Sequence, residues 1–388
     1  MNTFLLIILF LYIILSPFYI FPSGLPQPAD FIVAFGGFIF LFSPQFWKTF
    51  NERVVKKLFY FVLLVFVINY FYFLYYELFL GVENNMYFSA FFYIYNFLFF
   101  IISFYVLNGI KRVYIHNFIS FAIIFSISLQ FIISILGIGD TAGVRGKNFF
   151  NNPNQLGYYI LILTSLFVVI PNKFKNNIYI TLSTMFFSIY LVLISGSRGA
   201  LVGVFVLFII IFLKESFKFN VKSILFIFLF LIAGNYFIQT EFYYEQVSSI
   251  TNRHEAKPND ALSEVTNRAY NRILENPEYL LYGAGEGLFG RFGNSRLEVT
   301  QKLHSGLELH SGISTILFSY GILGFFLFFS FLYYIIKQKF WINLIILSPV
   351  MLYNMTHQGF RTSLLWLLFA SIYVITKNEN EANKNFLL

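Results

Sequence analysis

Cysteine is absent from this 388-residue chain, and charged residues make up only 11% of it. Without cysteine, disulfide bonds and cysteine-ligated metal sites are excluded. Aspartate is scarce as well: Asp30, Asp140 and Asp260 are isolated from one another and form no acidic pair. Histidine and glutamate show no metal-binding spacing such as HExxH. The sequence therefore predicts no metal and no other cofactor.

Apolar residues dominate what remains: 58% of the chain is hydrophobic and 22% aromatic, with 56 phenylalanines. Such a composition predicts an all-α polytopic membrane protein. A helix needs about 20 apolar residues to cross the hydrocarbon core, and the chain offers about twelve such stretches. The first lacks the charged start and the cleavage site of a signal peptide. The predicted spans cover residues 4–21, 29–43, 58–76, 87–108, 115–137, 155–171, 176–195, 199–213, 222–238, 311–336, 340–356 and 360–376.

A polar segment, residues 239–310, interrupts this pattern and is predicted to form one large, partly helical periplasmic loop. The nine spans within residues 1–238 precede it, three spans within 311–376 follow it, and residues 377–388 form a cytoplasmic tail. Lysine and arginine in short connections stay on the cytoplasmic side. Such cations occur in alternate connections between the predicted spans and on the C-terminal tail, so an even number of spans places both termini on the cytoplasmic side. The cations are Lys48, Arg53, Lys56, Lys57, Lys111, Arg112, Lys173, Lys175, Lys214, Lys218, Lys222, Lys337, Lys339, Lys377 and Lys384.

The net charge of +8 is thus explained by topology and by affinity for anionic lipid headgroups, and no nucleic-acid partner is predicted. The outer face nevertheless carries cations that the orientation rule does not require. A large translocated loop escapes that rule, which accounts for some of them. Arg198 and Arg361 lie instead in tight connections near the hydrocarbon boundary, where a charge is costly and indicates an anionic partner.

Arg198 belongs to SGSRG, residues 195–199, a turn of small residues that lets two helices meet closely. Backbone N–H groups beside a guanidinium suit a phosphate. The alternative is that Arg198 reaches towards lipid headgroups from an ordinary helix end.

An earlier outer connection, RGKNFFNNPNQLGYY at residues 145–159, combines two cations with several amides. Pro153 fits a first helical turn, which Asn152 can cap. A structural role is therefore as well supported as substrate binding. The candidates for substrate binding are Arg145, Lys147, Asn152, Asn154 and Gln155.

Within the loop, residues 260–276 are predicted to form an amphipathic helix with Arg268 and Arg272 on one face. Two cations at this spacing repel unless an anion bridges them. The alternative is a solvated face screened by Glu264 and Glu275.

Next comes NPEYLLYGAGEGLFGRFG, which includes Arg291, another candidate for substrate binding. Its glycines do not make a dinucleotide site, because no strand precedes them and the setting is not cytosolic. They form either a loop over a substrate or a simple connection.

Glu308 and His310 end the loop directly before a span. A histidine side chain exchanges protons near neutral pH, so one at the membrane surface is a candidate for proton transfer. A lone histidine at a helix start is more often a cap or a surface residue.

The order of these motifs resembles the O-antigen ligase and polymerase superfamily of bacterial envelope glycan synthesis. NNPNQLG heads an outer helix, SGSRGAL joins two spans, an external loop contains NPxxLLYGxG, and HSxxxxxxxxxG opens the next span. The resemblance covers residues 145–324. Each motif is weak alone, and one departs from the family pattern: Ser311 follows His310 where the family often has asparagine.

This resemblance implies a GT-C-like membrane glycosyltransferase of the bacterial inner membrane. It would move a glycan from undecaprenyl pyrophosphate at the periplasmic face, with inversion and without a metal. Arg198, with Arg268 or Arg272, would stabilise the departing diphosphate, and His310 or Glu308 would accept the proton. Arg361 joins the candidates for substrate binding. The implied partners are an undecaprenyl-pyrophosphate-linked oligosaccharide and membrane lipids, with a chain-length regulator left open.

Within the superfamily we favour an O-antigen polymerase, because the chain is of modest length and lacks a ligase-specific signature. A ligase that transfers the glycan to lipid A core is the alternative. A lipid-linked oligosaccharide flippase is the second alternative, but it predicts charges within the spans and two related halves. Here the unexplained cations cluster at one membrane face.

Overall fold

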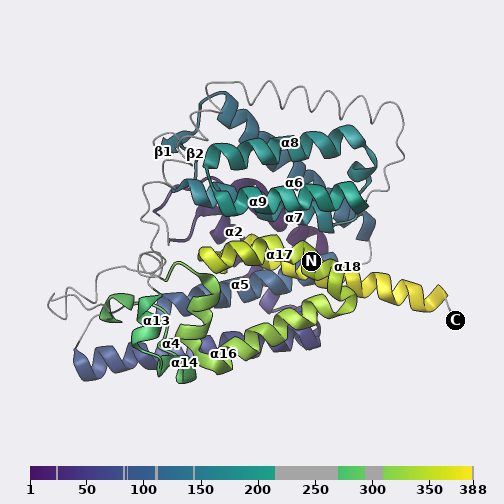
Figure 1. Ribbon diagram of the computed structural model, residues 1–388. Helices are drawn as coiled ribbons and strands as arrows, with labels where there is room; N and C mark the ends of the chain where they lie inside the picture. The colour runs from purple at the N-terminus through teal and green to yellow at the C-terminus, as the bar shows by residue number, and fades with distance from the viewer. Residues whose placement is uncertain are drawn as a thin grey trace. The chain divides into compact units, whose positions relative to one another are not determined.

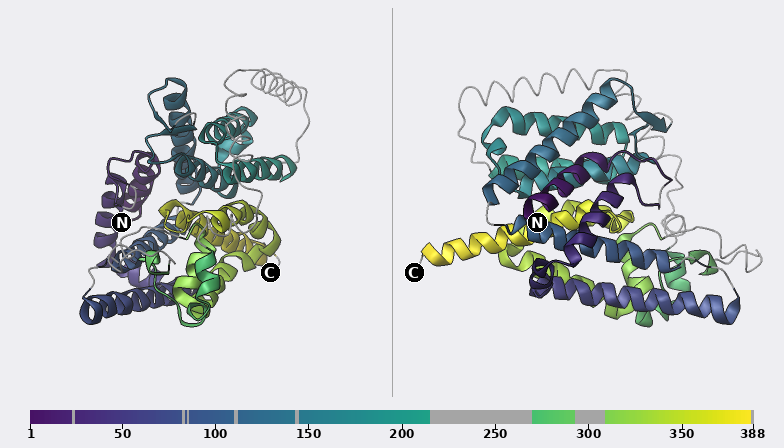
Figure 2. Two further views of the ribbon diagram at one scale, coloured as in Figure 1. Left: turned by 60° about the vertical axis from the view of Figure 1, so that its left-hand side comes forward. Right: turned by 180° about the vertical axis from the view of Figure 1, so that it is seen from behind.

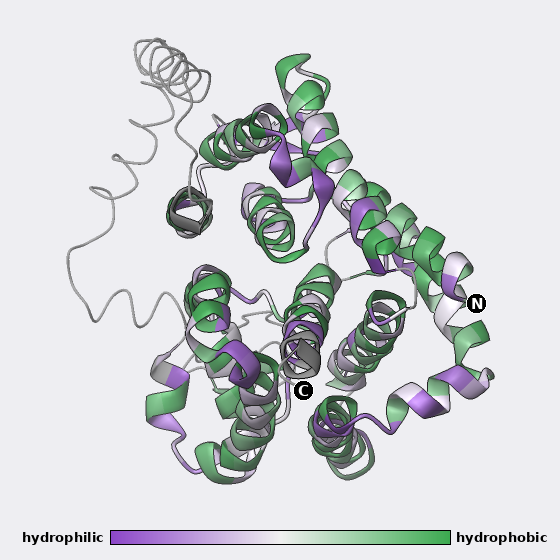
Figure 3. Cartoon of the chain, turned by 90° about the vertical axis from the view of Figure 1, so that its right-hand side faces the viewer, coloured by the Kyte–Doolittle hydropathy of each residue, from purple (hydrophilic) through white to green (hydrophobic). Residues whose placement is uncertain are grey.

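The chain is almost entirely helical in the computed structural model, which describes residues 1–22, 25–81, 84, 86–109, 112–142, 145–214, 270–292 and 309–386. Its helices are largely apolar, as Figure 3 shows. Internal contacts divide the chain into two units. Unit 1 comprises residues 1–35, 107–259 and 344–352, and unit 2 comprises residues 36–106, 260–343 and 353–388.

Every predicted span coincides with a helix except 222–238, which lies outside the described residues. Among the described residues, five helical stretches are long and apolar enough to cross a membrane. A sixth is present if α2 (Pro28–Leu41) and α3 (Pro44–Phe50), bent by 94°, form one span. This mostly helical architecture agrees with the predicted all-α membrane class, whereas the predicted number of twelve spans is not confirmed. The five stretches are Arg53–Phe79, Met86–Leu107, Arg112–Ile135, Ile178–Ser195 and Gly312–Thr356.

Some apolar helices are shorter than the sequence predicts. α1 (Asn2–Leu15) ends two residues before Pro17. Pro17 has no backbone N–H with which to continue the helical hydrogen bonds, so the predicted span to residue 21 is cut short. Two other apolar helices of less than full span length are Pro153–Val169 and Arg198–Ile210.

Unit 1 is built around α7 (Pro153–Val169), whose residues from Leu156 to Val169 are all buried. A helix that is apolar on every side is stable only when other helices surround it. Its neighbours are α6 (Arg112–Ile135), α8 (Ile178–Ser195) and α9 (Arg198–Lys214), and Figure 1 shows α8 and α9 beside it. α1 packs on α6, and the 3₁₀ turn η2 (Lys173–Asn176) links α7 to α8.

A small antiparallel hairpin, β1 (Asp140–Ala142) and β2 (Arg145–Asn148), packs against α7 and α8 and is coloured as hydrophilic in Figure 3. Asn148 has a positive φ of 48°, a conformation that asparagine tolerates better than most residues. Its buried amide donates to the backbone oxygen of Gln130 at 3.1 Å and to the side-chain oxygen of that residue at 2.9 Å. The hairpin is therefore anchored to α6.

Unit 2 contains α4 (Arg53–Leu74), α5 (Met86–Leu107), α16 (Gly312–Ile336) and α18 (Ser363–Phe386), with α17 (Phe340–Thr356) running into it. The π-helical turn η1 (Tyr75–Phe79) continues α4, and the 3₁₀ turn η4 (Lys337–Lys339) follows α16. α16 packs along α4 (Figure 2). Their contact is aromatic: the ring of Phe61 in α4 meets Tyr320 and Phe328 of α16 at 6.0 and 5.1 Å between centroids. The same ring also meets Tyr93 of α5 at 5.7 Å.

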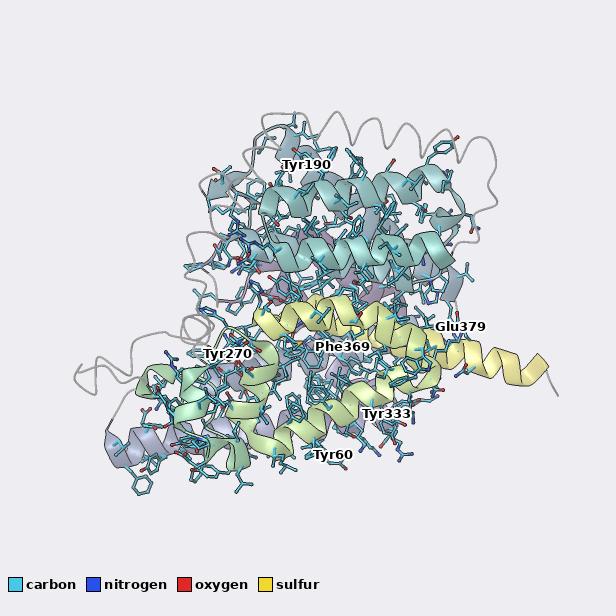
Figure 4. All side chains as sticks on the ribbon, viewed as in Figure 1. Tyr60, Tyr190, Tyr270, Tyr333, Phe369 and Glu379 are labelled. Atoms are coloured by element: carbon cyan, nitrogen blue, oxygen red, sulfur yellow. The ribbon has the colours of Figure 1, made fainter. Side chains whose placement is uncertain are left out.

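One end of unit 2 gathers cations around a tyrosine ring. There, Arg53, Lys57 and Lys337 surround the ring of Tyr334 at 5.0, 5.4 and 3.8 Å from its centroid. These residues were all assigned to the cytoplasmic side from the sequence, and the structure groups them. Towards the other end lies Tyr270, which Figure 4 shows well away from Tyr333. That end holds the start of α16 and the segments described next.

Candidate functional site

Arg198 is the first residue of α9 and is exposed, while the turn before it is buried. Gly196 has a φ of 57°, and the backbone N–H of Ser197 donates to the hydroxyl of Ser195 at 3.2 Å. A Cβ at Gly157 of α7 would lie 2.7 Å from the Cβ of Ser197. Small residues therefore let α7 and the SGSRG turn approach closely, as the sequence predicted. The turn packs inward, and the arginine stays at the surface.

Arg145 of β2 connects this turn to the start of α7. Its Nε donates to the carbonyl of Ser195 at 2.7 Å, and its Nη2 donates to the Oδ1 of Asn154 at 2.7 Å. A cation at the last carbonyls of a helix is stabilised by those carbonyls and by the helix dipole. Two of the predicted substrate-binding residues thus bond to each other, and in unit 1 they fix the position of the helix end that precedes Arg198.

Asn152 and Gln155 form a capping box at the start of α7, as the alternative structural interpretation predicted. The N–H of Gln155 donates to the Oδ1 of Asn152 at 3.0 Å, and the N–H of Asn152 donates to the Oε1 of Gln155 at 3.3 Å. Such a box satisfies backbone donors that a helix start leaves unpaired. Lys147 forms an ion pair with Asp140 at 3.2 Å, but the carboxylate is 73% exposed, so the pair contributes little.

His310 stands one residue before the cap of α16 in unit 2, and it is exposed. Ser311 is the cap: its hydroxyl accepts from the N–H of Ser314 at 3.2 Å. Serine is among the best helix caps, so replacing the family's usual asparagine preserves the helix start. Glu308, the other candidate for proton transfer, lies outside the described residues.

The turn between α17 and α18 packs against the first turn of α16. The N–H of Gly312 donates to the carbonyl of His357 at 3.0 Å, and a Cβ at Gly312 would lie 2.7 Å from the ring of Phe360. The amide of Gln358 reaches the hydroxyl of Thr315 at 3.5 Å. The segment carrying Arg361 and the segment carrying His310 are therefore brought together within unit 2.

Arg361 is paired with Glu286, a residue that the sequence analysis missed. The Nε and Nη2 of Arg361 donate to the Oε1 of Glu286 at 3.0 and 2.6 Å. The same oxygen accepts from Gln358 at 3.0 Å, and the Oε2 accepts from the hydroxyl of Tyr320 at 2.5 Å. Glu286 is fully buried, and its N–H donates to the Oδ1 of Asn69 in α4 at 2.7 Å. These bonds join segments far apart in the sequence.

Glu286 lies on a glycine-rich loop that follows α14 (Tyr279–Tyr282), and this loop docks into a break in α16. The break is at Gly321, whose φ of 63° and ψ of −171° are not helical. In a continuous helix the carbonyls of Phe318 and Ser319 would accept from amides four residues later. Here they accept from the N–H groups of Ala284 and Gly285 at 2.9 and 2.8 Å.

The close fit of this loop requires glycine. A Cβ at Gly283, where φ is 88°, would lie 2.6 Å from the carbonyl oxygen of Ser319. A Cβ at Gly321 would lie 2.6 Å from the carbonyl oxygen of Leu281. The glycines that the sequence analysis assigned either to a substrate loop or to a simple connection thus let two backbones touch at the break in α16, where the N–H groups of the loop satisfy the carbonyls that the break leaves unpaired.

Arg272 is the described member of the predicted loop pair. It lies in α13 (Asn271–Glu275) and is 5% exposed, so it is not part of a solvated face. Burial lowers its pKa from the usual value, and the neighbouring Glu275 offsets part of that change. The hydroxyl of Tyr270, at the start of this helix, donates to the carbonyl of Met355 at 2.9 Å. Arg268 lies outside the described residues, and Arg291 lies in the 3₁₀ turn η3 (Phe289–Phe292).

The predicted residues thus fall into two groups. Unit 1 holds Arg198 with Arg145, Asn154 and the capping residues, and unit 2 holds His310, Arg361 and Arg272. That one substrate meets both groups stays a prediction. Within the described ranges, no three side chains of histidine, aspartate or glutamate gather closely enough to hold a metal ion.

Part of the chain is similar to a known family. Residues 183–329 match the family model described as O-antigen ligase, a stretch that runs from α8 into α16 and includes the SGSRG turn, the glycine-rich loop and His310. No curated protein matches the chain. The match confirms the resemblance to the O-antigen ligase and polymerase superfamily and gives the flippase alternative no support.

Proposed function

We propose that the protein is an O-antigen polymerase that joins undecaprenyl-pyrophosphate-linked oligosaccharide units by inverting glycosyl transfer at the periplasmic face of the inner membrane. The family match supports ligase-type and polymerase-type activity alike. The observation that carries the site is the meeting, within unit 2, of the α16 start bearing His310 and the turn bearing Arg361. An exposed imidazole and a cation on adjoining segments are the groups that the reaction requires.

In the proposed reaction, an acceptor sugar hydroxyl attacks C1 of the lipid-linked sugar from the side opposite the diphosphate. A bond forms between the acceptor oxygen and C1, and the bond between C1 and the diphosphate oxygen breaks with its electron pair leaving on that oxygen. The acceptor's proton passes to His310. His310 suits this role because it is exposed and an imidazole nitrogen can accept a proton.

The departing diphosphate gathers negative charge, and Arg198 and Arg361 are the arginines that we assign to it, with Arg272 or Arg268 from the loop. Hydrogen bonds between charged groups contribute about 1.5–3 kcal/mol each. Donors that strengthen as charge develops lower the barrier rather than merely tightening substrate binding. A diphosphate is a good leaving group, so the proposed step is independent of a metal.

A ligase remains the second candidate, because the matching family model carries that description. The two activities differ in the acceptor: a polymerase adds the glycan to a second lipid-linked unit, and a ligase adds it to lipid A core. Purified protein supplied only with lipid-linked repeat units should therefore produce a ladder of products. A product formed only when lipid A core is added would replace our proposal with the ligase.

The same assay tests the proposed site. Arg198→Ala and His310→Ala should each abolish the ladder while leaving the protein inserted and abundant, because both side chains are exposed. Surface substitutions of this kind usually change stability by less than about 0.5 kcal/mol. Lys48, exposed on the predicted cytoplasmic side, supplies a control in Lys48→Ala. A normal ladder from both site variants would remove the proposed site.

A further inference from the structure

We propose that Glu286 is a positioning residue of the transfer site, which holds the guanidinium of Arg361 in place beside the start of α16. The inference rests on the proposed function and adds to it a residue that the sequence motifs did not indicate. Its starting point is the burial of a carboxylate between α4 and α16, both of them in stretches long and apolar enough to cross a membrane. Such a group is costly unless it is paired and fully hydrogen-bonded, and by default it indicates a functional site.

Glu286 is paired in this way. Arg361 supplies two N–H donors to one carboxylate oxygen, Gln358 supplies a third, and Tyr320 donates to the other oxygen. Four hydrogen bonds therefore converge on this carboxylate. The carboxylate is 0% exposed.

These bonds argue against Glu286 as the proton acceptor. Both carboxylate oxygens already accept hydrogen bonds, from Arg361 and from two further side chains, Gln358 and Tyr320. A fully buried group also cannot touch an acceptor sugar. His310 is exposed and keeps that role in the proposed reaction.

Arg361 is the member of the pair that reaches the surface. Its side chain is 22% exposed, whereas that of Glu286 is 0% exposed. The backbone carbonyl of Arg361 accepts from the buried amide of Asn96 in α5 at 3.1 Å, and its guanidinium lies 5.6 Å from the ring of Phe92. Both ends of the arginine are thus fixed, and Glu286 fixes the charged end.

The loop that carries Glu286 is itself fixed. Its backbone bonds to the broken part of α16 and, through Glu286, to Asn69 of α4. Tyr320, which donates to the carboxylate, stands one residue before the break at Gly321. Glu286 is therefore bonded to α4 and α16 on one side and to Arg361 on the other, so the two helices fix where the guanidinium lies. A cation placed by a rigid framework stabilises developing charge without rearranging during the reaction.

A double-mutant cycle tests this role with Glu286→Gln, Arg361→Gln and the double variant. Glutamine keeps the size of Glu286 and can still bond to Tyr320 and Gln358, but it leaves Arg361 without its counter-charge. We expect each single variant to lower kcat on lipid-linked units on the order of a hundredfold. The double variant should be about as slow as either single variant, because the two residues act as one unit in the reaction.

Thermal stability provides the second readout. Each single variant should melt below the wild type, because it leaves a buried group without its partner, and the double variant should recover much of that loss. If Glu286 served only the fold, activity would follow stability and recover in the double variant. Recovery of kcat together with stability would overturn the inference, as would a wild-type kcat in Glu286→Gln.

The ion pair of Lys339 and Glu379 offers a matched control at the other end of unit 2. Its members are 30% and 46% exposed, and Glu379→Gln should leave both kcat and melting temperature unchanged. The activity of the wild type distinguishes a failure of the proposed function from a failure of the role assigned to Glu286. A wild type that forms no product from lipid-linked units contradicts the proposed function, whereas an active wild type with an equally active Glu286→Gln contradicts only the role of Glu286.

Discussion

The break in α16 leads to a quantitative prediction for Gly321→Ala. The backbone at Gly321 has a φ of 63° and a ψ of −171°, a conformation that only glycine adopts readily. Forcing alanine into it costs about 1–3 kcal/mol. If α16 instead straightens, the carbonyls of Phe318 and Ser319 return to the helix, and the loop loses its bonds from Ala284 and Gly285.

Steric contact with the loop adds to the cost of a side chain at position 321. A Cβ at Gly321 would lie 2.6 Å from the carbonyl oxygen of Leu281 and 2.8 Å from the N–H nitrogen of Gly283. The loop therefore has to move away, and its two hydrogen bonds to α16 contribute about 0.5–1.5 kcal/mol each. The midpoints of these ranges add to about 4 kcal/mol of lost stability. Displacement of the loop also removes Glu286 from Arg361, so glycan transfer should fail.

Gly81 provides the matched control. It has nearly the same φ, 62°, but no atom lies within 4 Å of a Cβ built there. Gly81→Ala should cost only the left-handed backbone, about 1–2 kcal/mol. Unfolding in mixed micelles of mild detergent and increasing SDS measures both variants. Equal losses of stability for the two, or a Gly321→Ala variant with normal transfer, would refute the proposed docking of the loop.

Three smaller predictions concern the start of α7 and its surroundings, each measured by the same unfolding assay. Asn152→Ala removes the capping box and should cost about 1 kcal/mol, whereas the neighbouring Asn151→Ala should cost clearly less; equal effects would contradict the cap. Lys147→Ala should change stability by less than about 1 kcal/mol, because its partner is largely exposed; a larger loss would mean that the ion pair matters. Asn148→Ala should be the most damaging of these, at about 1–3 kcal/mol, since it leaves Gln130 without its buried donor; a neutral result would contradict that anchoring.

Local signals explain which parts of the fold were predictable. Apolar runs of span length predict helices because a backbone in lipid must satisfy its own hydrogen bonds. The α7 start followed from Asn152 and Pro153, since a cap and a first-turn proline act through neighbouring residues alone. The shortening of α1 was also readable in principle from Pro17. The number of full-length spans was not, because hydropathy alone does not place helix ends.

The residues of the candidate site were likewise predictable only where they belong to a local sequence motif. Arg198, His310 and the SGSRG turn stand in motifs whose order was visible in the chain, and the family match covers them. Glu286 sits among glycines with no charged neighbour in sequence that suggests a partner, so nothing local distinguished it from a loop glutamate. Gly321 is the last residue of the HSxxxxxxxxxG motif. The break that it makes in α16 depends nevertheless on the glycine-rich loop after α14, which docks there.

The amino-acid order was enough to predict features that depend only on residues close together in the sequence. These features are the membrane class, the helix caps and the location of cations in the connections between spans. The pairing of Glu286 with Arg361, 75 positions apart, was settled only by folding. The physical reason is that burial and partner choice are properties of surfaces that meet in space. An isolated carboxylate in the chain becomes a fixed counter-charge only when α4, α16 and the turn before α18 close around it.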